Sequence, residues 1–208
     1  MSKIDDIYNL AVSQLGYTEQ PNGYNKYNLE YYGRNSSSPW CVVFIWWLYQ
    51  HTGNADLFYG GGKMNGCGRL WTWYEKNQPD CIVRDKKPQK GDMVMFTFDG
   101  QPHCHIGWCE SYDGKYVTTI DGNTSEVGSQ DNGGHVLRRK RGKGCIWGVI
   151  RPRYNEGEKP QEVWYTVCKG DTLSKIGAMF GVPWKSIANL NGIKSPYTIY
   201  PNQKLRIK

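Results

Sequence analysis

The 208-residue sequence lacks an apolar run long enough to cross a membrane. Its longest run, Val42 to Tyr49, is far shorter than the ~20 residues that a spanning helix needs. The opening segment MSKIDDIYNL has adjacent acids and no apolar stretch, so it does not have the pattern of a secretory signal peptide. We therefore expect a chain that is made in the cytoplasm without a signal peptide and has no transmembrane segment.

The sequence also lacks a cysteine pattern typical of disulfide-bonded proteins. The sequence has seven cysteines, an odd number, and no CxxC pair, which favours reduced thiols over a disulfide framework. The segment HCHIGWC, residues 103–109, contains possible metal ligands. Its spacing differs from that of zinc sites and it has no second ligand pair, so a metal site is the less favoured interpretation. We predict no metal and no cofactor.

Acidic residues are scarce toward the end of the chain. Residues 159–208 contain eight Lys or Arg and only two Asp or Glu, whereas residues 1–154 contain 18 and 15. A basic module suits a polyanion, either a nucleic acid or an anionic cell wall, and charge alone does not choose. The polar segment NEGEKP between these parts predicts a linker at 155–160. The predicted domains are therefore 1–154 and 161–208.

The first domain is predicted to be α+β, with helices followed by an antiparallel meander. Ser2 can cap a helix that ends at Gly16, residues 17–35 form a tyrosine-rich loop, and a second helix opens at Cys41 and ends near Gly53. The other expected elements are a short helix at 69–77 and strands at 91–98, 105–112, 115–122, 135–141 and 145–152.

The second domain has a different predicted order, β-α-α-β. Its strands are expected at 163–169 and 204–208, around helices at 170–181 and 182–192. So small a domain needs a tightly packed core. The residues expected in that core are Val167, Leu173, Ile176, Phe180, Ile187, Leu190 and Leu205.

The segment NSSSPWCVVFIWWLYQHTG places Cys41 where a polar loop becomes an apolar helix. A thiol attacks acyl carbons as the thiolate, and its ordinary pKa of roughly 8.5 leaves little thiolate at neutral pH. The unpaired N–H groups at a helix N-terminus favour negative charge, and Pro39 suits the start of such a helix. The position therefore indicates a nucleophile, although a random cysteine is more often a core residue.

A nucleophilic cysteine needs a histidine nearby in space. His51 lies about 15 Å along the same helix, too far to serve. His105 opens a predicted strand and is preferred over His103. On the next strand Asp121 and Asn123 are two residues apart and share a face, where either side chain can hold the second ring nitrogen of the histidine. Cysteine, histidine, then acid or amide is the order expected of a cysteine hydrolase.

Four segments occur in the order found in the CHAP family: SPWCVVFIWWLY, KGDMVMF, HIGWCESYDGKYVTTIDGNTS and GGHVLRRKRGKGCIWGVIRP. The first domain therefore resembles a CHAP domain, which implies a papain-like fold and cysteine-dependent cleavage of amide bonds. The resemblance implies Cys41 as nucleophile, His105 as general base, and Asp121 and Asn123 as the orienting pair. Many members have Glu where Asp121 stands. Some bind calcium through an Asp-rich loop that this sequence lacks.

The donors for an oxyanion are less specified. The backbone N–H of Cys41 is one candidate, and Tyr27 or Ser38 is a candidate for the second; spacing does not choose between them.

The second domain resembles LysM along its whole length, from YTV through GDTL and NLNG to IYPNQKL. The resemblance implies binding of glycans that contain N-acetylglucosamine, in a shallow groove between two loops. Cys168 is expected to be a bystander. The matching glycan-binding positions are Gly170, Asp171, Thr172, Asn191, Ile193 and Ile199.

Together these resemblances predict a monomeric peptidoglycan hydrolase, a phage endolysin, that reaches the bacterial cell wall after release. It would act as an N-acetylmuramoyl-L-alanine amidase or an endopeptidase, with peptidoglycan as its partner. The alternative is a glycan-binding or structural phage protein with a degenerate catalytic domain. A third hypothesis, nucleic-acid binding through the basic tail, is not the one predicted. The basic run Arg138 to Lys143 falls at a hairpin end and is interpreted as a solvated turn.

Overall fold

The computed structural model describes residues 2–98, 101–126, 133–154 and 164–207, without the side chains of 101–104. The chain divides into two compact units, residues 1–154 and 155–208, and each is described by itself. The linker expected at 155–160 lies outside the described residues. None of the helices in the described part is both long and apolar enough to span a membrane.

The first unit begins with helices α1 (Lys3–Ser13) and α2 (Lys26–Tyr32). Ser2 caps α1 as predicted, because its side chain accepts a hydrogen bond from the Asp5 N–H. Helix α2 corrects the expectation of a loop over 17–35. It is only seven residues long and starts with its own cap, since the Asn25 side chain accepts from the Asn28 N–H.

Helix α3 (Cys41–His51) lies at the centre of the first unit, and all of its residues from Cys41 to Tyr49 are buried. A helix that is apolar on every side must be covered on every side. Helices α1 and α2 and strands β2 (Gln101–Tyr112) and β3 (Tyr116–Thr124) supply that cover. Helix α4 (Cys67–Asn77) begins two residues earlier than the sequence indicated. Short 3₁₀ turns stand at η1 (Ala55–Leu57), η2 (Tyr59–Gly61), η3 (Pro79–Cys81) and η4 (Lys143–Cys145).

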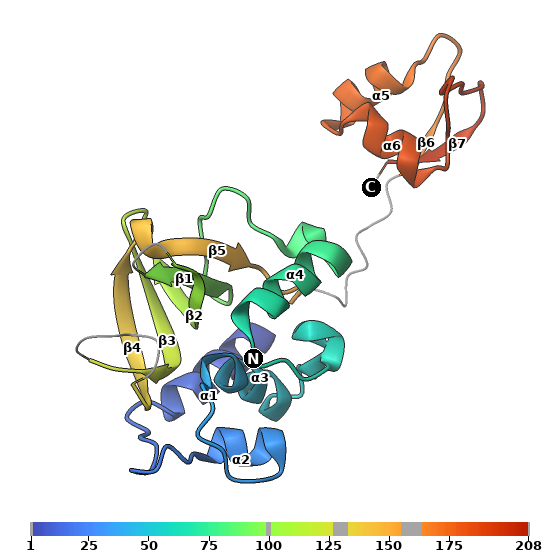
Figure 1. Cartoon of the computed structure of the whole chain (residues 1–208). Coiled ribbons are helices and arrows are strands. Elements are labelled where there is room, and N and C mark those ends of the chain that lie inside the picture. The colour runs from blue at the N-terminus through green and yellow to red at the C-terminus, as the bar shows by residue number, and fades with distance from the viewer. Residues whose placement is uncertain (1, 99–100, 127–132, 155–163, 208) are drawn as a thin grey trace. The chain divides into compact units, whose positions relative to one another are not determined.

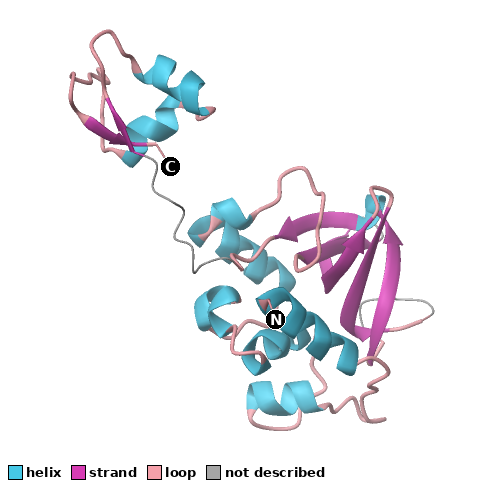
Figure 2. Cartoon of the chain, turned by 180° about the vertical axis from the view of Figure 1, so that it is seen from behind, coloured by secondary structure: helices cyan, strands magenta, loops and turns pink. Residues whose placement is uncertain are grey.

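The sheet of the first unit is antiparallel throughout, which confirms the α+β class. Its strands run in the order β4-β3-β2-β1-β5, with β5 antiparallel to β1 (Figures 1 and 2). The predicted meander is therefore correct for β1 to β4 only. Strand β5 pairs with β1 at the opposite edge of the sheet and not with β4, the strand before it in sequence. The strands are β1 (Met93–Phe98), β2 (Gln101–Tyr112), β3 (Tyr116–Thr124), β4 (His135–Gly142) and β5 (Ile146–Ile150).

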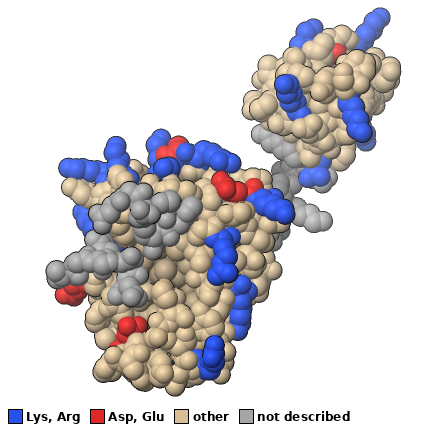
Figure 3. All heavy atoms as spheres, viewed as in Figure 1, with Lys and Arg blue, Asp and Glu red and all other residues tan. Residues whose placement is uncertain are grey.

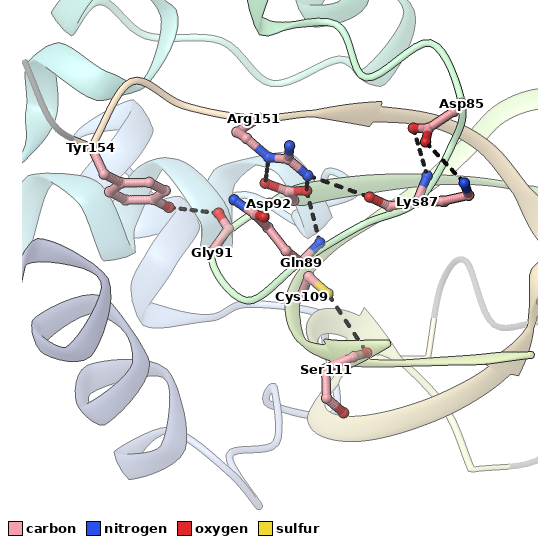
Figure 4. A network of polar contacts seen from close by, with 9 residues as sticks. All are labelled: Asp85, Lys87, Gln89, Gly91, Asp92, Cys109, Ser111, Arg151 and Tyr154. Atoms are coloured by element: carbon pink, nitrogen blue, oxygen red, sulfur yellow. Dashed lines mark hydrogen bonds and ion pairs between the residues drawn. The ribbon is translucent and has the colours of Figure 1, made fainter. Parts of the chain in front are cut away.

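An ion pair between a half-exposed arginine, Arg151, and a buried carboxylate, Asp92, fastens the end of β5 to the loop that enters β1 (Figure 4). Arg151 donates from Nη2 to Oδ2 of Asp92 at 2.8 Å and from Nε to Oδ1 at 3.0 Å, and the Gln89 N–H donates to Oδ2 at 2.9 Å. Arg151 also donates to the Lys87 carbonyl at 3.3 Å. Paired N–H donors from one guanidinium fix the angle as well as the distance. This pair fixes the edge strand that the sequence pattern did not place.

The second unit has the predicted β-α-α-β order: β6 (Trp164–Thr166), α5 (Leu173–Phe180), α6 (Trp184–Leu190) and β7 (Lys204–Arg206). Gly181 ends α5 in the left-handed conformation, at φ 64°. The core contains the expected apolar residues except Leu190, whose side chain is 45% exposed at the end of α6. Ala188 and Ile207 are buried in its place.

Candidate active site

Cys41 is the first residue of α3 and is buried, with 6% of its surface exposed. Three contacts hold the chain that leads into it. The Trp40 Nε1 donates to Oε2 of Glu19 at 2.8 Å, and its indole stacks on the Tyr27 ring with centroids 5.0 Å apart. The Asn28 amide donates to the Ser38 carbonyl at 2.7 Å. The loop is therefore fixed by buried side chains, and the thiol is held at the helix N-terminus.

His105 and Asp121 come from neighbouring strands, β2 and β3, and both side chains are fully buried. The imidazole Nε2 lies 2.9 Å from Oδ2 of Asp121. Gly107 makes room for this contact, since a Cβ atom there would lie 2.0 Å from Oδ1 of Asp121. The other ring nitrogen, Nδ1, is buried and has no hydrogen-bond partner among the described residues.

The Cys41 thiol and the His105 imidazole lie close enough to change each other's pKa. The pKa of the thiol is held well below its usual value, first by hydrogen bonding with the Cys67 thiol and, against the effect of burial, by His105 and the Val42 N–H. Burial alone would lower the pKa of His105, but interactions with Asp121 and Cys41 outweigh it and raise that pKa to about 9. A thiolate facing an imidazolium is the protonation state that these directions favour at neutral pH.

The sequence did not indicate two residues of this site. Cys67, the first residue of α4, is buried beside Cys41, and no local pattern around it signals that proximity. Arg141 is buried on β4, with Nη1 2.7 Å from Oδ2 of Asp121. The run Arg138 to Lys143 is therefore not a solvated turn throughout: β4 extends through Gly142, and Arg138 pairs with Glu110 at 2.6 Å.

The other residues considered from the sequence are the second orienting candidate, the two oxyanion-donor candidates and two further histidines. Asn123 is buried at an irregularity in the β3–β4 pairing, with a left-handed φ of 57°. The Tyr27 hydroxyl donates to Oε1 of Gln14 at 3.1 Å, and Ser38 accepts a hydrogen bond from the Ser36 hydroxyl. His51 faces Glu30, 3.4 Å away. The His103 side chain lies outside the described residues. No cluster of three or more metal-ligating side chains occurs in the part of the chain that the structure describes.

The positions expected to bind glycan flank α5 and α6 in the second unit. Gly170 has a left-handed φ of 91°, and Thr172 caps α5 by accepting from the Lys175 N–H. The Asp171 carboxylate accepts from the Cys168 N–H at 2.7 Å. The Asn191 amide bonds to both backbone groups of Arg206. Ile193 and Ile199 are half-buried against the core.

Comparison with known proteins gives two family matches. The CHAP domain model matches residues 32–123, and the LysM domain model matches residues 165–208. The N-acetylmuramoyl-L-alanine amidase sle1 of Staphylococcus saprophyticus is 51% identical over 43 residues, 21% of this chain and 13% of that protein. The uncharacterized lipoprotein YgeR of Escherichia coli is 51% identical over 43 residues, 17% of its length. The chain therefore matches less than a fifth of either relative.

Two solved structures align over longer stretches at low identity. The wild-type endolysin LysIME-EF1 aligns with 96% of this chain and 91% of its own, at 16% identity and a TM-score of 0.47. Ly7917 aligns with 79% of this chain and 65% of its own, at 13% identity and a TM-score of 0.45. The two family matches, each over the unit whose fold is described above, show that the chain contains a CHAP domain followed by a LysM domain.

Proposed function

We propose that this protein is a cysteine-dependent peptidoglycan hydrolase that cleaves an amide bond of the bacterial cell wall. The observation that carries the proposal is the buried arrangement of Cys41, His105 and Asp121 at the N-terminus of α3. A thiolate, an acid–base imidazole and a carboxylate that orients it are the parts that acyl transfer requires. The CHAP match covers all three residues.

The chemistry would proceed through an acyl-enzyme. The Cys41 thiolate attacks the scissile carbonyl, and the bond between Sγ and carbon forms as the carbonyl electrons move to oxygen. When the carbon–nitrogen bond breaks, the His105 imidazolium gives its proton to the leaving amine. Neutral His105 then takes a proton from water, the resulting hydroxide attacks the acyl carbon, and Cys41 leaves as thiolate. The products are a carboxylic acid and an amine.

The LysM domain would supply the second part of the function, attachment to wall glycan. Tethering the CHAP domain to its polymer raises the local substrate concentration without any new contact at the active site. On the face drawn in Figure 3, Lys and Arg side chains are spread over the surface rather than gathered in one patch. That distribution suits an extended anionic polymer such as the cell wall. We infer an endolysin that acts on peptidoglycan after its release.

The bond that is cleaved distinguishes the two activities in this proposal. An N-acetylmuramoyl-L-alanine amidase, the activity named for the relative sle1, would cleave the bond between the glycan and the stem peptide. An endopeptidase would instead release a new amino terminus within the stem or the cross-bridge. Mass spectrometry of purified peptidoglycan after digestion separates these products by the residue that carries the new amine.

The test of the proposal is the variant Cys41→Ala. We expect it to lose clearing of a cell-wall suspension while it still sediments with purified walls, because the LysM domain is unchanged. A variant that clears walls as the wild type does would remove Cys41 from the mechanism. A wild-type protein that binds walls and releases no new amine would leave the alternative of a glycan-binding protein with an inactive CHAP domain.

A further inference from the structure

Arg141 is a buried cation at the candidate active site. The residue is 5% exposed, and its Nη1 lies 2.7 Å from Oδ2 of Asp121 and 3.2 Å from Oγ1 of Thr119. Its guanidinium carbon lies 4.4 Å from the centroid of the Phe96 ring, a cation–π contact. Arginine is rarely buried unless it is paired. Arg141 also stands beyond residues 32–123, the part that the CHAP model matches.

One carboxylate oxygen joins Arg141 to the catalytic pair. Oδ2 of Asp121 lies 2.9 Å from Nε2 of His105 and 2.7 Å from Nη1 of Arg141. A thiolate and an imidazolium cancel in charge, and the Asp121 carboxylate then leaves one negative charge in a buried site. The Arg141 guanidinium supplies the matching positive charge. An uncompensated buried charge is costly because the interior solvates it poorly. The charge of Arg141 therefore decides which protonation states Cys41, His105 and Asp121 adopt.

Two further titratable groups face this site. The Cys67 thiol approaches Cys41 from α4. Arg139, half-buried on β4, interacts with Asp121 and Arg141, and its pKa is lowered by burial and by the nearby Arg141 cation. The Arg139 side chain donates to the Glu126 carbonyl at 3.3 Å. Arg141 is the cation in direct contact with the Asp121 carboxylate, so we assign the balancing charge to it.

We propose that Arg141 is a positioning residue that keeps Asp121 ionised and neutralises the buried site, so that the Cys41 thiolate forms at neutral pH. This inference rests on the proposed function, because it gives a role to the same thiolate. Removing the Arg141 cation would leave the site one charge negative, and uptake of a proton by Cys41 would cancel that charge. The same loss would stabilise the His105 imidazolium. Both titrations therefore move to higher pH.

The experiment measures the rate at which iodoacetamide alkylates Cys41 as a function of pH, in the full chain, with peptide mapping to separate Cys41 from the other cysteines. Arg141→Gln keeps amide donors for Asp121 and Thr119 but removes the charge. We expect the pH of half-maximal alkylation to rise by about one unit, no more than the low end of the ~1–3 units that a directly contacting charge exerts, because Arg141 contacts Asp121 and not Cys41. Arg141→Lys keeps the charge, and we expect its half-point to stay within about half a unit of wild type.

Arg138→Gln is the matched control. It removes an arginine from the same strand, one whose side chain is half-exposed and pairs with Glu110, and its half-point should equal that of the wild type. A folded Arg141→Gln variant with a wild-type half-point overturns the proposal. The proposal is also overturned if the pH of half-maximal alkylation in Arg141→Lys rises by a full pH unit. If Arg141→Gln fails to fold, the Arg141→Lys measurement alone tests the proposal.

Alkylation also separates this inference from the proposed function. It needs no wall substrate, so a protein without hydrolase activity still reports the charge balance at Cys41. A wild-type chain that cleaves walls while Arg141→Gln has an unchanged half-point refutes the role of Arg141 alone.

Discussion

Nε2 of His105 lies 2.9 Å from Oδ2 of Asp121, and neither side chain is exposed. In the Ser-His-Asp template the acid holds Nδ1 and the nucleophile faces Nε2. Here the acid holds Nε2, so Nδ1 is the ring nitrogen left for the Cys41 thiol. In neutral His105 the proton stays on Nε2, and the Nε2–H donates a hydrogen bond to Asp121. The lone pair of Nδ1 is then available to accept a proton from water. The contact therefore fixes both the ring and its tautomer.

The pH dependence of wall cleavage should have its alkaline limb near pH 9. The pKa of His105 is raised to about 9, so the imidazolium is present below that pH and is lost above it. Without the imidazolium the leaving amine receives no proton, and kcat should fall about tenfold per pH unit above the limb. The measurement is release of new amines from purified walls, with the sedimentation of Cys41→Ala on the same walls as a control for binding. A limb near pH 6.5, the ordinary value for histidine, would contradict the ion-pair description.

Cys67→Ala should raise the pKa of Cys41 and so reduce the fraction of thiolate at neutral pH. Hydrogen bonding with the Cys67 thiol is the largest cause of the lowered pKa of Cys41, and alanine removes that donor. We expect half-maximal alkylation of Cys41 to move to higher pH and the rate of wall cleavage at pH 6 to fall.

Cys81→Ala is the control for Cys67→Ala. It deletes a thiol that is also buried, that of the last residue of η3, which donates to Oε1 of Gln78, and so creates a cavity of similar size. An equal shift in both variants would show that packing, and not the Cys67 hydrogen bond, sets the pKa of Cys41.

Gly107→Ala should disrupt the site from the strand that carries His105. The new Cβ would lie 2.0 Å from Oδ1 of Asp121 and 2.9 Å from the Cβ of Thr119, so the carboxylate or the strand must move. Overpacking of this kind costs about 1–3 kcal/mol of stability, and a shifted Asp121 no longer orients His105. We expect activity to fall at least tenfold, more than the change in unfolding free energy accounts for.

The comparison for Gly107→Ala is Gly144→Ala. A Cβ at Gly144 meets nothing within 4 Å, so that variant should keep both stability and activity. Chemical denaturation and wall cleavage measured on both proteins give the two quantities. Full activity in a stable Gly107→Ala protein would mean that Asp121 is not needed in its present position.

The sequence predicted those parts of the site that depend on local chain chemistry. Cys41 follows a proline and a tryptophan at the start of an apolar helix, and His105 and Asp121 stand on strand segments separated by a turn, so both types of element were predictable. Arg141 was not, because a basic run resembles a solvated surface until the pairing of β3 with β4 turns one arginine inward. The proximity of Cys67 depends on how α4 packs, which no pattern of spacing encodes.

The same limit applies to the fold. Each strand of the sheet was predicted as a segment bounded by turn residues, but the position of β5 beside β1 depends on contacts between distant residues. The Asp92–Arg151 ion pair joins residues 59 positions apart. Helix α2 was missed because its tyrosine-rich sequence has modest helix propensity, and its stability comes from packing against α3.

Asn191 gives a prediction that separates two roles in the LysM domain. Its Nδ2 donates to the Ile187 carbonyl at 2.8 Å and to the Arg206 carbonyl at 2.7 Å, while Oδ1 accepts from the Arg206 N–H at 2.8 Å. These bonds fasten the end of α6 to β7. We therefore expect Asn191→Ala to destabilise this domain by about 1–3 kcal/mol, since it leaves backbone groups of Arg206 without their partner.

Hydrogen exchange of the backbone amides in 187–206, followed in the full chain, measures that loss directly. Asn189→Ala is the control, because its exposed side chain lies on the same helix and alanine suits a helix at least as well. If Asn191 acts through structure, exchange protection and binding of N-acetylglucosamine oligomers fall together, and lowering the temperature restores both. If Asn191 contacts the glycan itself, binding falls while exchange protection of the free protein stays at the wild-type level. The second outcome would mean that the Arg206 contacts give way to a sugar when glycan binds.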